Sequence, residues 1–127
     1  MMTVMISGSR SIKRLPQEAI ASLDKIMELG YEIIIGDAPG VDALIQQYLR
    51  LKGYEKVTVY YAMFNGLGCP RNSNDYPTVG VVGNYVDRDS RLCTIANYGL
   101  AIWDGRSKGT RNNIAKVKRT KVITVIA

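Results

Sequence analysis

Residues 99–114 read GLAIWDGRSKGTRNNI, in which an apolar run is followed by a turn rich in glycine and hydroxyl side chains. The run predicts a buried strand, and the segment from Thr110 onward predicts a helix. A helix start leaves backbone N–H groups without intrahelical partners and carries partial positive charge, which favours anions. Gly105 and Gly109 allow the backbone to approach a ligand closely, and Ser107 and Thr110 add hydroxyl groups. This stretch therefore predicts a phosphate-binding turn.

Short apolar runs and helical patterns alternate along the rest of the chain. The runs predict strands at residues 3–6, 31–35, 56–61, 100–103 and 121–126, and the periodic segments predict helices that begin near Pro16, Val41, Asn84 and Thr110. Residues 64–83, rich in glycine, proline and asparagine, predict a long loop. This alternation favours an α/β fold. We expect a single Rossmann-like, three-layer domain over residues 1–127, with a mostly parallel five-stranded sheet and helices on both faces.

The composition narrows the classes of partner and chemistry. Seventeen Lys and Arg against eleven Asp and Glu give a net charge of +6, which favours phosphate-bearing partners. The absence of His excludes His-based acid–base catalysis and His-containing metal sites. Cys69 and Cys93 lack CxxC spacing, so we expect reduced thiols and a cytoplasmic protein. No apolar run approaches the ~18 residues of a membrane span, so no membrane association is expected. We assign no residue to a metal and expect no resident cofactor.

Three glycine-rich loops follow the predicted strands at residues 3–6, 31–35 and 100–103. If the first strand lies between the other two, the loops meet, because ligands of open parallel sheets bind beyond the carboxyl ends of the strands where strand order reverses. The residues assigned to this ligand site are Gly8, Ser9, Arg10, Gly36, Asp37, Gly40, Val41, Arg88, Asp104, Gly105, Ser107, Gly109 and Thr110.

The residue types at this site suggest a division of roles. Backbone N–H groups of residues 7–10 and 104–110 are expected to bind a phosphate, with Arg10 and Arg88 as counter-charges. Arg10 has the alternative of lying in solvent. Asp42 also has a structural alternative, since a carboxylate in the first turn of a helix is stabilised by the helix dipole. The carboxylates expected to bind a sugar or position a water are Asp37, Asp42 and Asp104.

Arg88 and Asp89 are neighbours within a predicted helix. Consecutive helical residues point about 100° apart, so we do not expect the two to pair with each other. One interpretation has one of them facing the ligand site while the other meets a neighbouring helix. The alternative is that both belong to surface ion pairs elsewhere.

Four motifs stand in order along the chain: ISGSR at residues 6–10, GDAPGVDA at 36–43, YxxRD at 85–89 and WDGxSxGT at 103–110. Together they resemble the SLOG superfamily, the Rossmann-like group that contains the lonely-guy phosphoribohydrolases and DNA-processing protein A, and within it the YspA/YpsA-related branch. The match runs from about residue 4 to the end of the chain. The resemblance implies a nucleotide or nucleotide-derived ligand where these loops meet.

The resemblance also bears on catalysis. Lonely-guy enzymes carry a glutamate shortly after a P-G-G-x-G-T motif, and it takes part in cleaving the N-glycosidic bond of a nucleoside monophosphate. Here Gly109 and Thr110 are followed by Arg-Asn-Asn at 111–113, with no acid. Asp89 is the candidate substitute, and Asp42 is the second candidate for a catalytic base.

Three functions remain open on the sequence alone. We expect a protein that binds a nucleotide or related phosphorylated ligand as a sensor or ligand-processing protein. The enzyme alternative is a nucleoside-monophosphate phosphoribohydrolase-like hydrolase. The weaker alternative is single-stranded nucleic-acid binding through the basic C-terminal helix, which lacks interleaved aromatic residues. We also expect a homo-oligomer, because relatives of this type assemble and the 64–83 segment offers the apolar residues Tyr76, Val79, Val81 and Val82.

Overall fold

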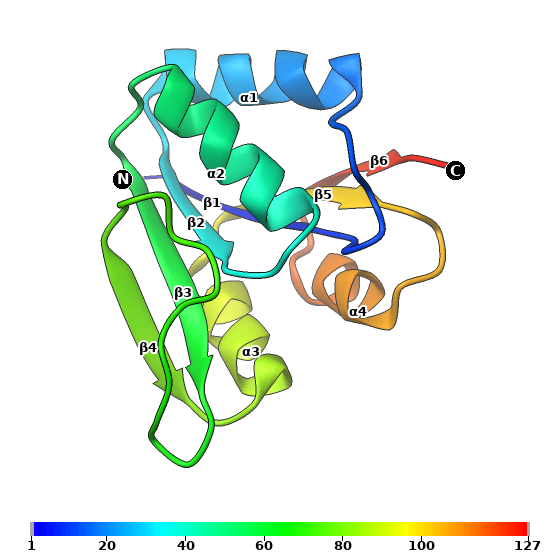
Figure 1. Ribbon diagram of the computed structural model, residues 1–127. Helices are drawn as coiled ribbons and strands as arrows, with labels where there is room; N and C mark the ends of the chain where they lie inside the picture. Colours follow the sequence, from blue (N-terminus) through cyan, green and yellow to red (C-terminus); the bar gives the residue numbers. More distant parts are fainter. Residues whose placement is uncertain (1, 127) are drawn as a thin grey trace.

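The structure, a computed structural model, describes residues 2–126 and is a three-layer Rossmann-like α/β domain (Figure 1). All strands of the central sheet pair in parallel, in the order β4-β3-β2-β1-β5-β6. The strands are β1 Thr3–Gly8, β2 Glu32–Gly36, β3 Val57–Met63, β4 Thr78–Val82, β5 Tyr98–Trp103 and β6 Thr120–Thr124. Helices α1 Gln17–Leu29 and α2 Val41–Leu51 cover one face, and α3 Tyr85–Ile95 and α4 Lys108–Lys116 cover the other.

The sheet has six strands, so the expectation of five is wrong. The additional strand, β4, lies inside the 64–83 segment that was expected to be a loop throughout. Its sequence, TVGVV, pairs along its length with β3. A glycine interrupts the β-branched run, and a Cβ at Gly80 would lie 2.3 Å from Sδ of Met63. Gly80 therefore allows the Met63 side chain to pack across β4, and this same glycine obscures the strand pattern.

The apolar core is divided unequally between the two faces of the sheet. The larger cluster lies under α1 and α2 and includes Leu23, Ile45 and Leu49, all fully buried. The cluster under α3 and α4 consists of Met5, Ile34, Leu92 and Val117, with a few partly buried neighbours. The α3–α4 layer is therefore held with less apolar burial, and polar contacts supply part of its packing.

Strand order reverses at β1. The chain leaves β1 towards β2 on one side and returns through α3 to β5 on the other side. Gly8 lies opposite Ile102 of β5, and Ile6 lies opposite Ile35 of β2. The loops that follow β1, β2 and β5 consequently meet at one end of the sheet, as the alternation of strands and helices predicts. None of the helices within residues 2–126 is long and apolar enough to cross a bilayer.

Candidate functional site

A cavity of about 190 Å³ opens beyond the carboxyl ends of β1 and β2, between α3 and α4. It lies where the three glycine-rich loops were expected to meet. The residues predicted from the sequence that line it are Gly8, Ser9, Arg10, Gly36, Asp42, Arg88, Asp89, Ser107, Gly109 and Thr110. Ile6, Ser7, Ala38, Arg71, Tyr85, Leu92 and Asn113 line it as well. Elements distant in the sequence therefore build one site.

Five of the predicted residues shape the surroundings of the cavity without lining it: Asp37, Gly40, Val41, Asp104 and Gly105. Val41 packs against the backbone of Gly8, where a Cβ would lie 2.3 Å from Cγ1 of Val41. Gly40 has a positive φ of 84°, and a Cβ there would meet the backbone of Arg10. These residues let the three loops approach one another closely.

Ser9 joins the three loops. Its hydroxyl lies 2.7 Å from the hydroxyl of Ser107 and accepts a hydrogen bond from the backbone N–H of Asp104 at 2.9 Å. Its carbonyl accepts from the backbone N–H of Val41, and its own N–H donates to the carbonyl of Ile102. Because Ser9 is almost completely buried, these contacts fix the loop geometry before any ligand binds.

The turn between β5 and α4 is closed by Asp104. The backbone N–H groups of Ser107 and Arg106 each donate to Oδ1 of Asp104 at 2.8 Å, and the hydroxyl of Ser11 donates to Oδ2 at 2.8 Å. These bonds hold the pKa of Asp104 well below its usual range. The Asp104 carboxylate thus serves the turn itself. The backbone N–H groups of Ser9, Asp104, Arg106 and Ser107, which were expected to bind phosphate, are already occupied.

The first turn of α4 offers the remaining donors. The first helical hydrogen bond runs from the N–H of Arg111 to the carbonyl of Ser107. The N–H groups of Lys108, Gly109 and Thr110 precede it and have no partner among the described residues. Gly109 lines the cavity, and a Cβ at this position would meet nothing within 4 Å. An anion can therefore approach these N–H groups without obstruction.

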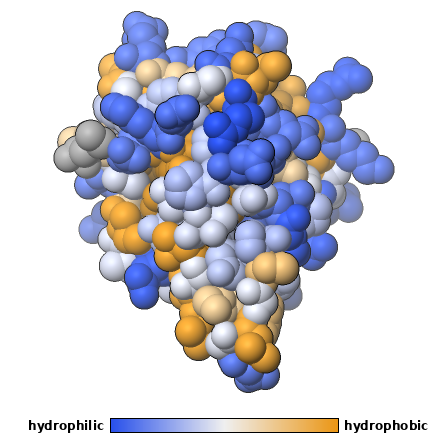
Figure 2. Space-filling view, turned by 60° about the vertical axis from the view of Figure 1, so that its left-hand side comes forward, coloured by the Kyte–Doolittle hydropathy of each residue, from blue (hydrophilic) through white to orange (hydrophobic). Residues whose placement is uncertain are grey.

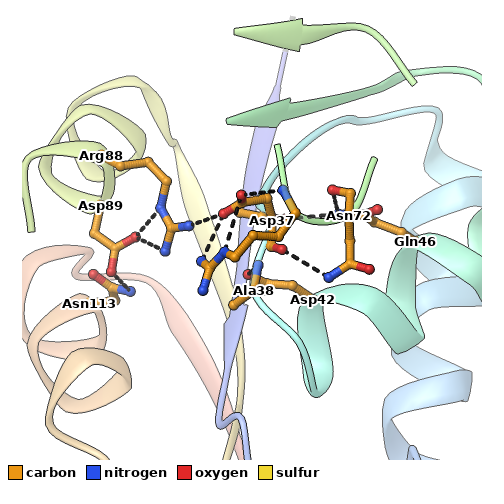
Figure 3. A network of polar contacts seen from close by, with 10 residues as sticks. Asp37, Ala38, Asp42, Gln46, Asn72, Arg88, Asp89 and Asn113 are labelled. Carbon is orange, nitrogen blue, oxygen red and sulfur yellow. Dashed lines mark hydrogen bonds and ion pairs between the residues drawn. The ribbon is translucent and has the colours of Figure 1, made fainter. Parts of the chain in front are cut away.

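A chain of ion pairs forms the opposite wall (Figure 3). Arg88 donates from Nη1 to Oδ1 of Asp37 at 2.7 Å, and its Nε and Nη2 both lie 3.0 Å from Oδ1 of Asp89. Asn113 of α4 donates to the other oxygen of Asp89 at 3.3 Å. The expectation that Arg88 and Asp89 do not pair is wrong, because the guanidinium of Arg88 reaches the carboxylate of its neighbour as well as that of Asp37. Both side chains also line the cavity.

Sequence reasoning missed Arg71. Its backbone N–H and its guanidinium both donate to Asp37, at 2.8 Å from the backbone and 2.9 Å from Nη2, and the guanidinium lies 4.4 Å from the ring centre of Tyr85. Burial alone would raise the pKa of Asp37, but the hydrogen bonds and charge of Arg71, with the charge of Arg88, hold it below its usual value. One signal was present, since Arg71 is the only Lys or Arg in residues 64–83.

Asp42 is a buried carboxyl group at the start of α2. Its Oδ2 accepts one hydrogen bond, from the backbone N–H of Ala38 at 3.1 Å. Burial raises the pKa of Asp42 to about 7, and the nearby carboxylates of Asp89 and Asp37 act in the same direction against Arg88. A cavity-lining group that titrates near neutrality can donate or accept a proton.

The ion pairs leave little free charge in the cavity wall. Arg71 and Arg88 are balanced by Asp37 and Asp89, so Arg88 is not the free counter-charge that was expected. Arg10 lines the cavity, is exposed, and makes no ion pair within residues 2–126. The cationic contribution to an anion site thus comes from Arg10 and from the amino end of α4.

The basic run at the end of the chain is split between both faces of the sheet. Lys116 reaches Ser90 of α3, whereas Lys121 reaches Ser22 of α1. Because α1 and α3 cover opposite faces, these cations do not form one continuous row.

Comparison with known proteins adds no relative. No protein-family model matches the chain, and neither a curated protein nor a solved structure gives a significant match.

Proposed function

We propose that this protein binds a nucleotide or nucleotide-derived phosphorylated ligand, with a phosphate group at the amino end of α4. The observation that carries the proposal is a set of three backbone N–H groups, at Lys108, Gly109 and Thr110, that have no partner among the described residues. They lie beside the cavity, and Gly109 has no side chain that would narrow it. Arg10 adds positive charge from the β1 loop. Backbone N–H groups at a helix start form a common phosphate site in α/β proteins.

The size of the cavity suggests which part of the ligand is enclosed. At about 190 Å³ it is smaller than the ~300–1,000 Å³ of typical ligand pockets. A phosphate and its sugar fit such a space, with the base directed towards the mouth. Asp42, whose Oδ1 has no partner among the described residues, is available to accept a hydrogen bond from a sugar hydroxyl. This contact would favour a nucleotide over inorganic phosphate.

The binding role is tested by calorimetric titration with nucleoside monophosphates, ribose 5-phosphate and unphosphorylated nucleosides. Gly109→Val is expected to weaken monophosphate binding at least ~10-fold, because the side chain occupies the approach to the N–H groups. Asn112→Val is the matched control, since it places the same side chain on the exposed part of α4 and is expected to bind as the parent does. Equal binding by nucleosides and monophosphates would contradict the proposal.

Salt dependence separates this proposal from nucleic-acid binding. A mononucleotide in a cavity responds modestly to salt, whereas a strand that neutralises many cations loses affinity steeply. Binding that is abolished by Lys116→Glu with Lys118→Glu, but unchanged in Gly109→Val, would favour the nucleic-acid alternative.

One observation favours hydrolysis as a second candidate function. Asp42, with a pKa raised by burial to about 7, lines the same cavity and can carry a proton near neutral pH. Asp89 is the weaker candidate, because Arg88 and Asn113 occupy both of its oxygens. In this reaction water adds across the N-glycosidic bond, and the products are the free base and ribose 5-phosphate. Chromatography of reactions with each nucleoside monophosphate tests it, and binding without release of base would leave the sensor role.

A further inference from the structure

An exposed apolar surface lies at the end of the molecule where β3 and β4 finish. We call it the apolar tip and define it as Phe64, Leu67, Val82, Tyr85 and Val86. Phe64 meets the Tyr85 ring edge-on and pairs with Leu67 in an isolated β-bridge, and Val82 lies opposite Met63, the residue before Phe64. Leu67 is 74% exposed and Val82 is 69% exposed. In Figure 2, hydrophobic side chains gather at the narrow lower end of the molecule, with pale residues between them and a hydrophilic group at the extreme end.

The residues of the 64–83 segment that were expected to contact another copy differ in exposure. Tyr76 and Val81, which were expected to offer an apolar contact to another copy, are buried in the protein's own packing. Val82 is exposed, and Phe64, Leu67 and Val86 join it. The exposed apolar residues of the 64–83 segment therefore lie towards its two ends, where they belong to the apolar tip, and not in its middle.

The tip continues into an unprotected sheet edge. β4 pairs with β3 on one side only, so its outer N–H and C=O groups have no strand partner. Proteins usually guard such edges with charged residues or by a covering segment. β6, at the opposite edge, carries Lys121 and follows Lys118 and Arg119. β4 has no charged residue, so the two edges of this sheet differ in their ability to accept another strand.

Charge favours a second copy of the chain as the occupant. The chain carries +6, and two copies repel each other over most of their surfaces. Residues 64–70 and 76–86 contain no Lys, Arg, Asp or Glu, so two copies meet here without bringing like charges together. A partner attracted by charge would instead bind where the basic residues are exposed.

We propose that this protein forms a dimer in which the β4 strands of two copies pair antiparallel across a two-fold axis, and the apolar tip of each copy packs against the amino end of the other copy's β4. A strand edge is complementary to itself in the antiparallel orientation, so one patch serves both copies. The pairing joins the two sheets and covers Leu67 and Val82. Tyr85 belongs both to the tip and to the cavity lining, so the second copy stands next to the ligand site.

Sedimentation velocity over a range of protein concentrations tests the dimer. The parent chain is expected to sediment as a dimer, and Val82→Lys is expected to weaken dimerisation about 100-fold, because it places a charge within an apolar contact. Val122→Lys is the matched control on the β6 edge, where Val122 is also exposed, and it is expected to remain dimeric. A parent chain that stays monomeric, or a control that dissociates as readily as Val82→Lys, would overturn the proposal.

A second variant keeps the test decisive if Val82→Lys does not fold. Leu67→Glu lies in the loop after β3, outside the sheet hydrogen bonds, and is also expected to give a monomer, with a circular dichroism spectrum like that of the parent. If Val82→Lys fails to fold, Leu67→Glu decides the question, and a dimer that persists in it would count against the tip. Nucleotide titration of either variant measures ligand binding independently of dimerisation.

Discussion

Asp37→Ala is expected to lower the free energy of unfolding by about 3 kcal/mol, one of the two largest effects that the structure predicts. Asp37 is almost completely buried and accepts hydrogen bonds from Arg71 and Arg88. Its removal leaves the buried Arg88 guanidinium with one carboxylate where it had two. We place the loss at the lower end of the range for a broken buried ion pair, because Asp89 still faces Arg88 and the half-exposed Arg71 regains water.

Urea unfolding followed by circular dichroism at neutral pH measures this loss. Glu28→Ala is the control, because its ion pair with Lys25 is exposed on both sides and is expected to change stability by no more than about 0.5 kcal/mol. A similar, small change in both variants would show that the Asp37 ion pairs do not hold the cavity wall together.

Asp42→Asn is expected to be increasingly more stable than the parent as the pH rises from about 4 to 7. Burial raises the pKa of Asp42 to about 7 in the folded chain, from an ordinary value of 3.8. The folded state therefore holds its proton more tightly than the unfolded state, and stability from this group falls across that interval. Above about pH 7 the full cost of the buried charge is present, roughly 4 kcal/mol for a shift of this size. Asparagine keeps an oxygen for the N–H of Ala38 and does not titrate.

The measurement is the difference in unfolding free energy between Asp42→Asn and the parent at several pH values. Taking this difference removes the contribution of Asp37, which both proteins share. The lowered pKa of Asp37 makes the fold more stable as the pH rises, whereas Asp42 makes it less stable. Glu28→Gln makes the same kind of replacement at an exposed position and serves as the control. A flat difference for Asp42→Asn would mean that the carboxyl group is hydrated in the folded protein.

Most of the fold follows from local patterns in the sequence. The central strand β1 and its neighbours β2 and β5 are continuous β-branched or apolar runs, which is the pattern of strands buried on both faces. β4 does not have that pattern, because Gly80 replaces a side chain where Met63 crosses the strand. A glycine that serves packing by a distant residue looks the same in the sequence as a glycine in a loop.

The candidate site was predictable to the extent that it depends on loops after consecutive strands. Gly8, Gly36 and Gly109 follow from the turn pattern, and each borders the cavity. The charge balance did not follow. Arg71 approaches Asp37 because residues 64–77 return over the end of β2. Arg88 is neutralised because α3 places it against Asp37 of the β2 loop as well as beside Asp89. Such pairings depend on tertiary placement, which single-residue patterns do not report.

The unequal division of the apolar core has a further consequence for how this molecule opens. The layer formed by α3 and α4 is secured by few apolar side chains, so its backbone is the part expected to exchange amide hydrogens with solvent through local unfolding, while the α1–α2 layer stays closed. The part of the cavity wall that α3 and α4 form belongs to that less stable layer. A ligand that contacts both helices would therefore stabilise this layer and slow the exchange of its amide hydrogens.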